Sequence, residues 1–276
     1  MPDTSIFWLR AAALLYVPGV VQALTTLLRR ETRLFGPAFG AFAVGTVFEL
    51  VSIVERGIAR DRLPLNNFFE SMAACAFLLS VAFLIVYWRY QFQSIGVFIY
   101  PLVFVMTFIS SFEQPSGPWV NQSVRSVWLA VHVLLILLGY AALVVTAIAS
   151  LFYLIQERQL KSKRPGKWFD RLPALGTLDT LITQAMGVGF GFITLGVVAG
   201  SSWAYVEWGT RWLGQERIAF SFLTWAFYLV MVFLRASAGW RGRKAAFMAL
   251  TVLGCSALTW VAHAGLLSSG SAVIGH

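Results

Sequence analysis

The chain has 276 residues, of which 58% are hydrophobic and only 12% charged, against about 25% charged in an ordinary soluble domain. This composition, with 11 Trp and 23 Phe, excludes a soluble enzyme, a disordered tail and a secreted disulfide scaffold. The net charge of +9 lies in short clusters between apolar runs, a pattern typical of membrane-protein loops and not of a nucleic-acid-binding surface. We therefore expect an integral membrane protein whose surroundings are the lipid bilayer, with no nucleic-acid partner.

A membrane-spanning helix needs about 20 mostly apolar residues. Eight segments meet this requirement, at about 5–28, 34–54, 68–88, 95–110, 124–155, 179–204, 218–235 and 245–267. The fourth is short and contains Pro101, and the fifth is longer than a bilayer requires. The predicted fold is all-α, a polytopic membrane protein of about eight transmembrane helices that form a single domain over residues 1–276.

The distribution of basic residues predicts the orientation. Fourteen of the 21 Lys and Arg residues follow the first, third, fifth and seventh segments, and seven lie on the opposite side. Because basic loops stay in the cytoplasm, both termini are predicted to lie outside. Residues 156–178 then form a basic cytoplasmic loop, and residues 205–217 form an external loop rich in tryptophan.

Three histidines fall in the predicted outer half of the membrane or beyond it: His132, His263 and the C-terminal His276. An imidazole inside a membrane helix is a candidate functional group, because an unpaired polar ring in hydrocarbon is costly. Axial ligation of haem iron is one role for such a residue. The alternative is a histidine that hydrogen-bonds to a neighbouring helix or reaches the membrane interface.

Aromatic residues gather on the same predicted side. Trp203, Trp208, Trp212 and Trp225 surround the external loop, together with Arg211. They suit an aromatic belt that anchors helix ends at the headgroup level. They equally suit a shelf for a large planar ligand such as a porphyrin, whose carboxylates would meet Arg211.

Several stretches resemble the cytochrome c assembly protein family, the CcsA/ResC type of haem-handling membrane proteins with its HemX-like relatives. The matching stretches are residues 63–71 (LPLNNFFES), 128–132 (WLAVH), 139–142 (GYAA), 194–204 (TLGVVAGSSWA), 208–212 (WGTRW) and 239–243 (GWRGR).

The resemblance implies a protein that holds non-covalent haem b at the outer membrane face and presents it to apocytochrome c, beside a CcsB/ResB-type membrane subunit. His132 and His263 would then be metal ligands, with His276 a further candidate, and the four tryptophans and Arg211 would contact the haem. It also implies the bacterial inner membrane as the location. The chain would be a component of a cytochrome c haem lyase or synthase; whether it is itself an enzyme stays open, and no catalytic residue is assigned.

Two departures from the family pattern weaken this interpretation. The centre of the family's tryptophan-rich loop is replaced by residues 214–218 (GQERI), and Phe233 stands where the family has a transmembrane histidine shortly before Arg235. Phenylalanine cannot ligate iron, so we expect no internal haem site. The alternative functions are a HemX-like regulatory or assembly protein, and a structural subunit of a larger membrane complex. A small-molecule transporter is disfavoured, because Glu49 and Glu70 are expected near helix ends and few charges are expected inside the helices.

Overall fold

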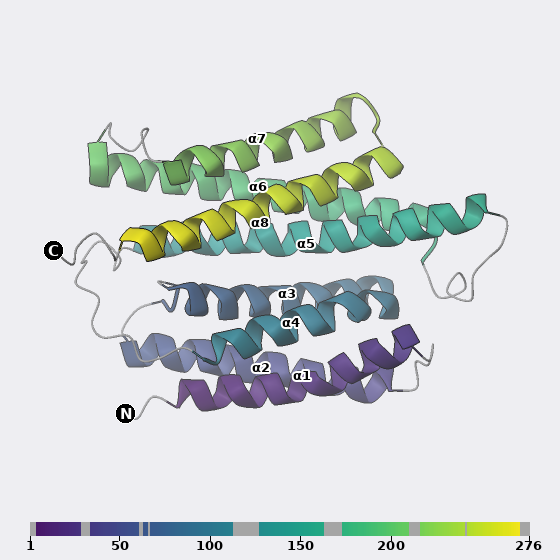
Figure 1. Ribbon diagram of the computed structural model, residues 1–276, viewed down its shortest axis with the longest axis horizontal. Coiled ribbons are helices and arrows are strands. Elements are labelled where there is room, and N and C mark those ends of the chain that lie inside the picture. Colours follow the sequence, from purple (N-terminus) through teal and green to yellow (C-terminus); the bar gives the residue numbers. More distant parts are fainter. Residues whose placement is uncertain are drawn as a thin grey trace. The chain divides into compact units, whose positions relative to one another are not determined.

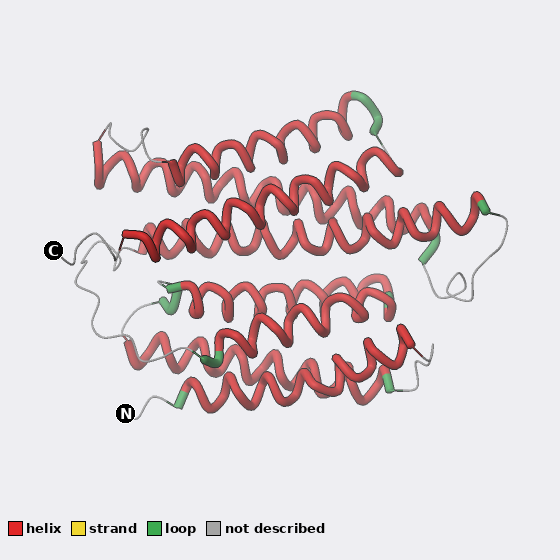
Figure 2. The backbone as a smooth tube through the Cα atoms, viewed as in Figure 1, coloured by secondary structure: helices red, strands yellow, loops and turns green. Residues whose placement is uncertain are grey.

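The computed structural model describes residues 4–28, 34–60, 63–65, 67–112, 127–162, 173–209, 216–240 and 242–270, and these are helical apart from short turns (Figures 1 and 2). The helices in chain order are α1 (Ser5–Leu28), α2 (Phe35–Arg60), α3 (Phe68–Tyr90), the 3-10 turn η1 (Gln93–Ile95), α4 (Gly96–Ser110), α5 (Val127–Lys161), α6 (Leu175–Trp208), α7 (Glu216–Ser237) and α8 (Arg243–Gly270).

The eight predicted segments correspond one to one to the eight α-helices among the described residues. Six helical segments of that part of the chain are long and apolar enough to cross a membrane: α1, α2, α3, η1 with α4, α5 and α6. The all-α fold and the multi-pass membrane character are confirmed. The number of spans and the side on which the termini lie remain predictions.

Several predicted boundaries were wrong by one to two turns. Helix α2 continues to Arg60 and α5 to Lys161, while α6 begins at Leu175 and ends at Trp208. The predicted loops at 156–178 and 205–217 are therefore partly helical at both ends.

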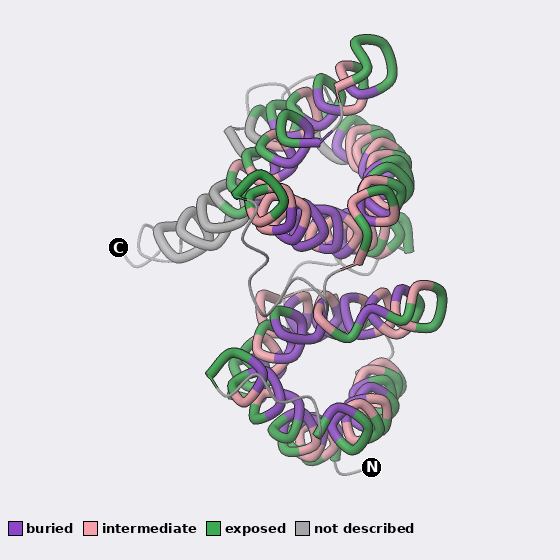
Figure 3. The backbone as a smooth tube through the Cα atoms, turned by 90° about the vertical axis from the view of Figure 1, so that its right-hand side faces the viewer, coloured by how far each residue is buried: buried purple, intermediate pink, exposed green. Residues whose placement is uncertain are grey.

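The chain forms two compact units, residues 1–130 and 131–276. In the first unit, α1 packs against α2 and α4, and α3 packs against α2 and α4. In the second, α7 packs against both α6 and α8. Figure 3 shows the buried residues of each unit on the helix faces that turn toward the other helices of the same unit.

The core of the first unit is aromatic toward one end. Phe42 packs edge-on against Phe83 with ring centroids 5.5 Å apart, and Tyr100 lies 5.0 Å from Phe42 and 5.4 Å from Phe83. All three side chains are essentially inaccessible to solvent. Contacts of this kind hold the helices of the unit together where neighbouring lipid tails offer no hydrophobic driving force.

The second unit has a core of Leu143, Met186, Ile193, Tyr228, Met231, Ala249 and Val252. Its helices α5 and α6 approach closely at glycines: a Cβ added at Gly139 would lie 3.1 Å from the carbonyl oxygen of Gly189, and one at Gly196 would lie 3.3 Å from the backbone nitrogen of Ile136. Small residues at helix contacts permit this backbone proximity in membrane proteins.

The expectation of few charges inside the helices was wrong. Glu49, Arg56, Glu70 and Arg235 are all buried. Glu49 lies in the middle of α2 and not near its end, because α2 extends eleven residues beyond it to Arg60. Glu70 does lie at a helix end: it is in the first turn of α3, where its backbone N–H is capped by the Asn67 side chain at 2.7 Å and its carboxylate pairs with Arg60.

Candidate functional site

His132 lies five residues after the start of α5 and contacts α6. Its Nδ1 is 2.6 Å from the carbonyl oxygen of Gly196. A carbonyl oxygen only accepts hydrogen bonds, so Nδ1 carries the proton and donates it. In a neutral imidazole the lone pair is then on Nε2, the nitrogen that a metal ion binds.

The His132 ring occupies space that only a glycine leaves open on α6. A Cβ at Gly200 would lie 2.5 Å from Cε1 and Nδ1 of His132 and 3.1 Å from its Nε2. Gly196 and Gly200 are one helical turn apart, so both lie beneath the same ring. The Gly196 carbonyl orients His132, and the absence of a side chain at Gly200 leaves space for its ring.

This geometry fits an axial ligand of haem iron. Histidines that ligate metals in proteins generally donate their other ring N–H to a carboxylate, a backbone carbonyl or water, which fixes the tautomer and the ring orientation. His132 has such a bond to a backbone carbonyl. It is the only histidine whose side chain lies within the described part of the chain.

Trp203 lies near the same end of the α5–α6 pair as His132. It follows Gly200 by three residues, so it shares the face of α6 that carries Gly196 and Gly200. Its side chain is half-buried. The predicted association of Trp203 with His132 is therefore compatible with the helix register.

Trp225 has a different environment. Its indole Nε1 donates to Thr194 Oγ1 at 3.1 Å, and its ring stacks on Phe190 with centroids 6.4 Å apart. Thr194 and Gly196 are two residues apart on α6, so they point in nearly opposite directions. Trp225 and His132 therefore contact different faces of α6, and this placement favours a packing role for Trp225.

The remaining predicted site residues have no described side chain. Arg211, Trp212 and His276 lie outside the described residues, and for Trp208 and His263 only the helical backbone is described. Their predicted roles stay predictions.

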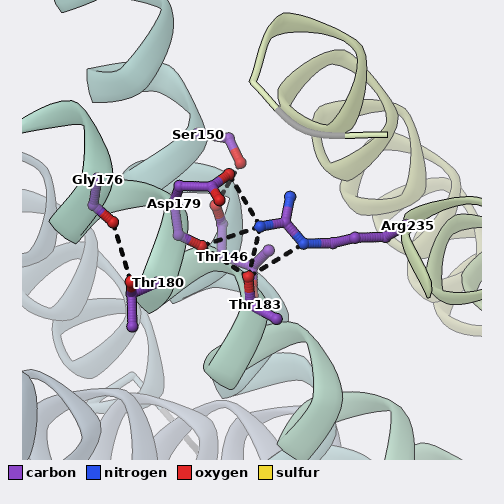
Figure 4. A network of polar contacts seen from close by, with 7 residues as sticks. All are labelled: Thr146, Ser150, Gly176, Asp179, Thr180, Thr183 and Arg235. Atoms are coloured by element: carbon purple, nitrogen blue, oxygen red, sulfur yellow. Dashed lines mark hydrogen bonds and ion pairs between the residues drawn. The ribbon is translucent and has the colours of Figure 1, made fainter. Parts of the chain in front are cut away.

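A buried ion pair joins α7 to α6 (Figure 4). It lies near the start of α6, whereas His132 contacts the part of α6 nearer its end. Arg235 Nη2 donates to Asp179 Oδ1 at 2.9 Å and to the Asp179 carbonyl oxygen at 3.0 Å, and Nε donates to Thr183 Oγ1 at 3.1 Å. Phe233, two residues earlier on α7, is 63% exposed and points away from this pair. Arg235 is therefore held by Asp179 and Thr183, and Phe233 takes no part in this contact.

Three features of the candidate site and its surroundings were not predicted from the sequence. They are the contact of Gly196 and Gly200 with His132, the partner of Arg235 and the place of Glu49 in a helix interior. The G-x-x-x-G spacing of Gly196 and Gly200 indicates a close helix contact, but it does not identify the partner. The partners of His132 and Arg235 depend on contacts between segments far apart in the chain.

Comparison with known proteins identifies the family. Residues 65–268 match the family described as Cytochrome C assembly protein. The relatives of this chain include proteins named "Cytochrome c biogenesis protein CcsA". The protein of Prochlorococcus marinus (strain MIT 9301) is 29% identical over 240 residues, covering 76% of this chain and 78% of the relative. That of strain MIT 9312 is 30% identical over 209 residues, covering 67% and 68%.

The third relative, from the alga Chlamydomonas reinhardtii, is 28% identical over 214 residues, covering 75% of this chain and 59% of the relative. The family match extends from the loop before α3 into α8, and so includes the α5–α6 pair that carries His132. The chain belongs to the cytochrome c assembly protein family.

Proposed function

We propose that this protein acts in cytochrome c biogenesis as a membrane haem-handling protein, which holds haem b near the outer membrane face and presents it for attachment to apocytochrome c. Family membership supports the role in cytochrome c biogenesis. The observation that carries the haem assignment is the hydrogen bond from His132 Nδ1 to the Gly196 carbonyl, which orients Nε2 as a ligand.

In this proposal the protein contributes ligation and orientation. His132 would hold one axial position, and Trp203, Trp208, Trp212 and Arg211 would contact the haem edge and its carboxylates, with His263 or His276 as the second ligand. Haem supplies the iron and the vinyl groups that join the thiols of a C-x-x-C-H segment. Because His132 is held by α6, the protein would determine where the vinyl edge of the haem is presented.

We further propose that the protein spans a bacterial inner membrane with both termini outside, and that it works beside a CcsB/ResB-type subunit as a component of a haem lyase. The excess of Lys and Arg after the odd-numbered helices supports this orientation.

One observation favours a second candidate function. Phe233 stands where the family resemblance implies a transmembrane histidine, and its side chain is exposed on α7, so a haem site at this position would lack its histidine. A HemX-like regulatory or assembly protein would retain the scaffold without binding haem. It would purify without colour and together with a protein partner.

The experiment that separates the two is a reduced-minus-oxidised absorption spectrum with a pyridine haemochrome assay, on protein purified in detergent from haem-replete cells. We expect near-stoichiometric b-type haem. A colourless preparation with intact helical circular dichroism would reject haem handling in favour of the second candidate.

A substitution at Gly200 tests the role of the hydrogen bond from His132 to the Gly196 carbonyl without altering any predicted ligand. Gly200→Ala places a methyl group against the His132 ring, which must then rotate away from the Gly196 carbonyl. Loss of such an orienting bond lowers metal affinity about 10- to 100-fold, and we expect haem retention during purification to fall accordingly. Gly191→Ala is the matched control on the same helix, because a Cβ there meets nothing within 4 Å. Equal haem content in the two variants would contradict the proposed role of His132.

A further inference from the structure

The first unit contains a buried polar cluster, to which each of its four α-helices contributes a side-chain oxygen atom. Glu49 of α2 is at its centre and has no solvent exposure. Its Oε2 accepts a hydrogen bond from Tyr16 of α1 and its Oε1 accepts one from Thr107 of α4, each at 2.8 Å. Thr46 of α2 and Ser80 of α3 lie within hydrogen-bonding reach of the Tyr16 hydroxyl.

Glu49 has no ion-pair partner among the described residues. The nearest arginine on its own helix, Arg56, is two turns away, and its Nε donates to the Ser5 hydroxyl at 3.3 Å. Arg60 is paired with Glu70. An ionised carboxylate enclosed in a membrane-spanning helix bundle without a cation is strongly disfavoured. Neutralising Glu49 therefore requires a positive charge that the described residues do not provide.

The other titratable groups that face Glu49 are not cations. They are Tyr16 on α1, Cys75 on α3 and, further along the core, Tyr100 on α4; Glu55 lies six residues along α2 and accepts hydrogen bonds from the backbone N–H and the hydroxyl of Thr4. Tyr16 donates a hydrogen bond to Glu49, and neither its hydroxyl nor the Cys75 thiol carries a positive charge. None of them can neutralise a carboxylate.

The hydroxyl groups around Glu49 can satisfy it in either protonation state. When Glu49 is ionised, Tyr16 and Thr107 donate to it, as observed. When it is protonated, its O–H can donate to the Tyr16 oxygen, and the Tyr16 hydroxyl can turn toward Thr46 or Ser80. Hydroxyl groups are donors and acceptors and rotate to suit their partners, so neither state leaves a buried polar atom unpaired.

Buried polar groups continue from Glu49 toward the end of the unit where α1 begins. Ser52, one turn along α2 from Glu49, donates to the Ser5 carbonyl at 2.7 Å, and Ser5 in turn contacts Arg56. This line of polar groups leads to the end where α1 begins and α2 ends (Figure 1).

Toward the other end the core contains the aromatic contacts of Phe42, Phe83 and Tyr100, and the buried side chains of Gln22 and Thr26 of α1 bond to each other. The buried Tyr100 hydroxyl has no hydrogen-bond partner among the described residues, so it does not extend the cluster around Glu49.

We infer that Glu49 is a proton-binding site inside the membrane that exchanges protons with the end of the unit where α1 begins. A proton from water at that end adds to a carboxylate oxygen of Glu49 and gives the neutral acid, and it leaves by the reverse path. This assignment is independent of haem, because it concerns the first unit only.

Infrared difference spectroscopy of the full-length protein in lipid nanodiscs tests the inference. We expect a C=O stretching band of a protonated carboxylic acid that appears and disappears as the pH of the buffer changes. The band should be absent from Glu49→Gln and retained in Glu55→Gln, the matched control on the same helix. Tyr16→Phe and Thr107→Val keep the shape of the site and remove one hydrogen bond each, so they should move the band to higher frequency.

The path is tested by the rate at which the same band shifts after transfer into deuterated buffer. Ser52→Ala should slow this exchange several-fold, whereas Ser202→Ala, which removes a hydroxyl bonded only within α6, should leave it unchanged. An equal rate in the two variants would reject the path through Ser52.

Three results would overturn the proton site itself. A Glu49 band that persists at every pH would make the cluster a permanent structural contact. The absence of a band at every pH would show that the carboxylate stays ionised. Loss of the band on addition of sodium chloride, but not of choline chloride, at constant pH would assign the site to a metal cation instead.

Discussion

Replacement of His132 by alanine should remove most of the haem from the purified protein. The substitution deletes the only described side chain that has the orientation of an iron ligand, with Nδ1 bound to Gly196. Loss of an outer partner alone costs about 10- to 100-fold in metal affinity, so loss of the ligand itself should cost at least as much. The measurement is the pyridine haemochrome content per protein, beside the reduced-minus-oxidised spectrum.

Two variants separate ligation from folding. His132→Gln retains a side-chain N–H that can donate to the Gly196 carbonyl but provides no imidazole, so it should keep the fold and lose the haem. Leu134→Ala, at an exposed position two residues along α5, should keep both. Addition of free imidazole to His132→Ala should restore part of the spectrum, because the alanine leaves a space of the right shape. A His132→Ala protein with the wild-type spectrum would refute the assignment.

Replacement of Arg235 by leucine should destabilise the second unit by about 3 kcal/mol, the lower end of the cost of breaking a buried ion pair. The Arg235 side chain is 5% exposed and that of Asp179 is 23% exposed. Removal of the arginine leaves the Asp179 carboxylate without its cation and releases Thr183 from its contact. The shift can be measured by unfolding in mixed detergent micelles, with helical circular dichroism as the readout.

The matched controls for this change lie in the same unit. Lys161→Leu breaks an exposed pair with Glu157, where the lysine side chain is 69% exposed, and should cost less than about 1 kcal/mol. The double variant Arg235→Leu with Asp179→Leu should recover much of the stability, because no unpaired charge remains. If Arg235→Leu costs no more than Lys161→Leu, the pair makes no net contribution to stability.

The fold could be predicted from the sequence because the bilayer sets the length of apolar segments. The first segment was predicted at 5–28 and observed at Ser5–Leu28, and the others agree to within about two turns. The largest errors arose where charged residues were taken as the end of a helix. Helix α2 continues through Glu55 and Arg56, whose side chains find hydrogen-bond partners in Thr4, just before α1, and Ser5 of α1.

The site was predicted less completely than the fold. His132 was identified because an imidazole in an apolar segment is rare and costly to bury. What the sequence could not reveal is which atom orients it, since Gly196 is 64 residues away. Trp225 was grouped with the other tryptophans by proximity in the chain, whereas its partners Phe190 and Thr194 lie on a face of α6 that His132 does not contact.

The glycine seam between α5 and α6 also bears on the order of events during delivery of the cofactor. His132 packs against Gly200 and is hydrogen-bonded to Gly196, so moving its ring aside breaks that hydrogen bond. In the proposed function, His132 would therefore hold the haem in a fixed position, and His263 or His276 would be the residue that gives way when haem is delivered.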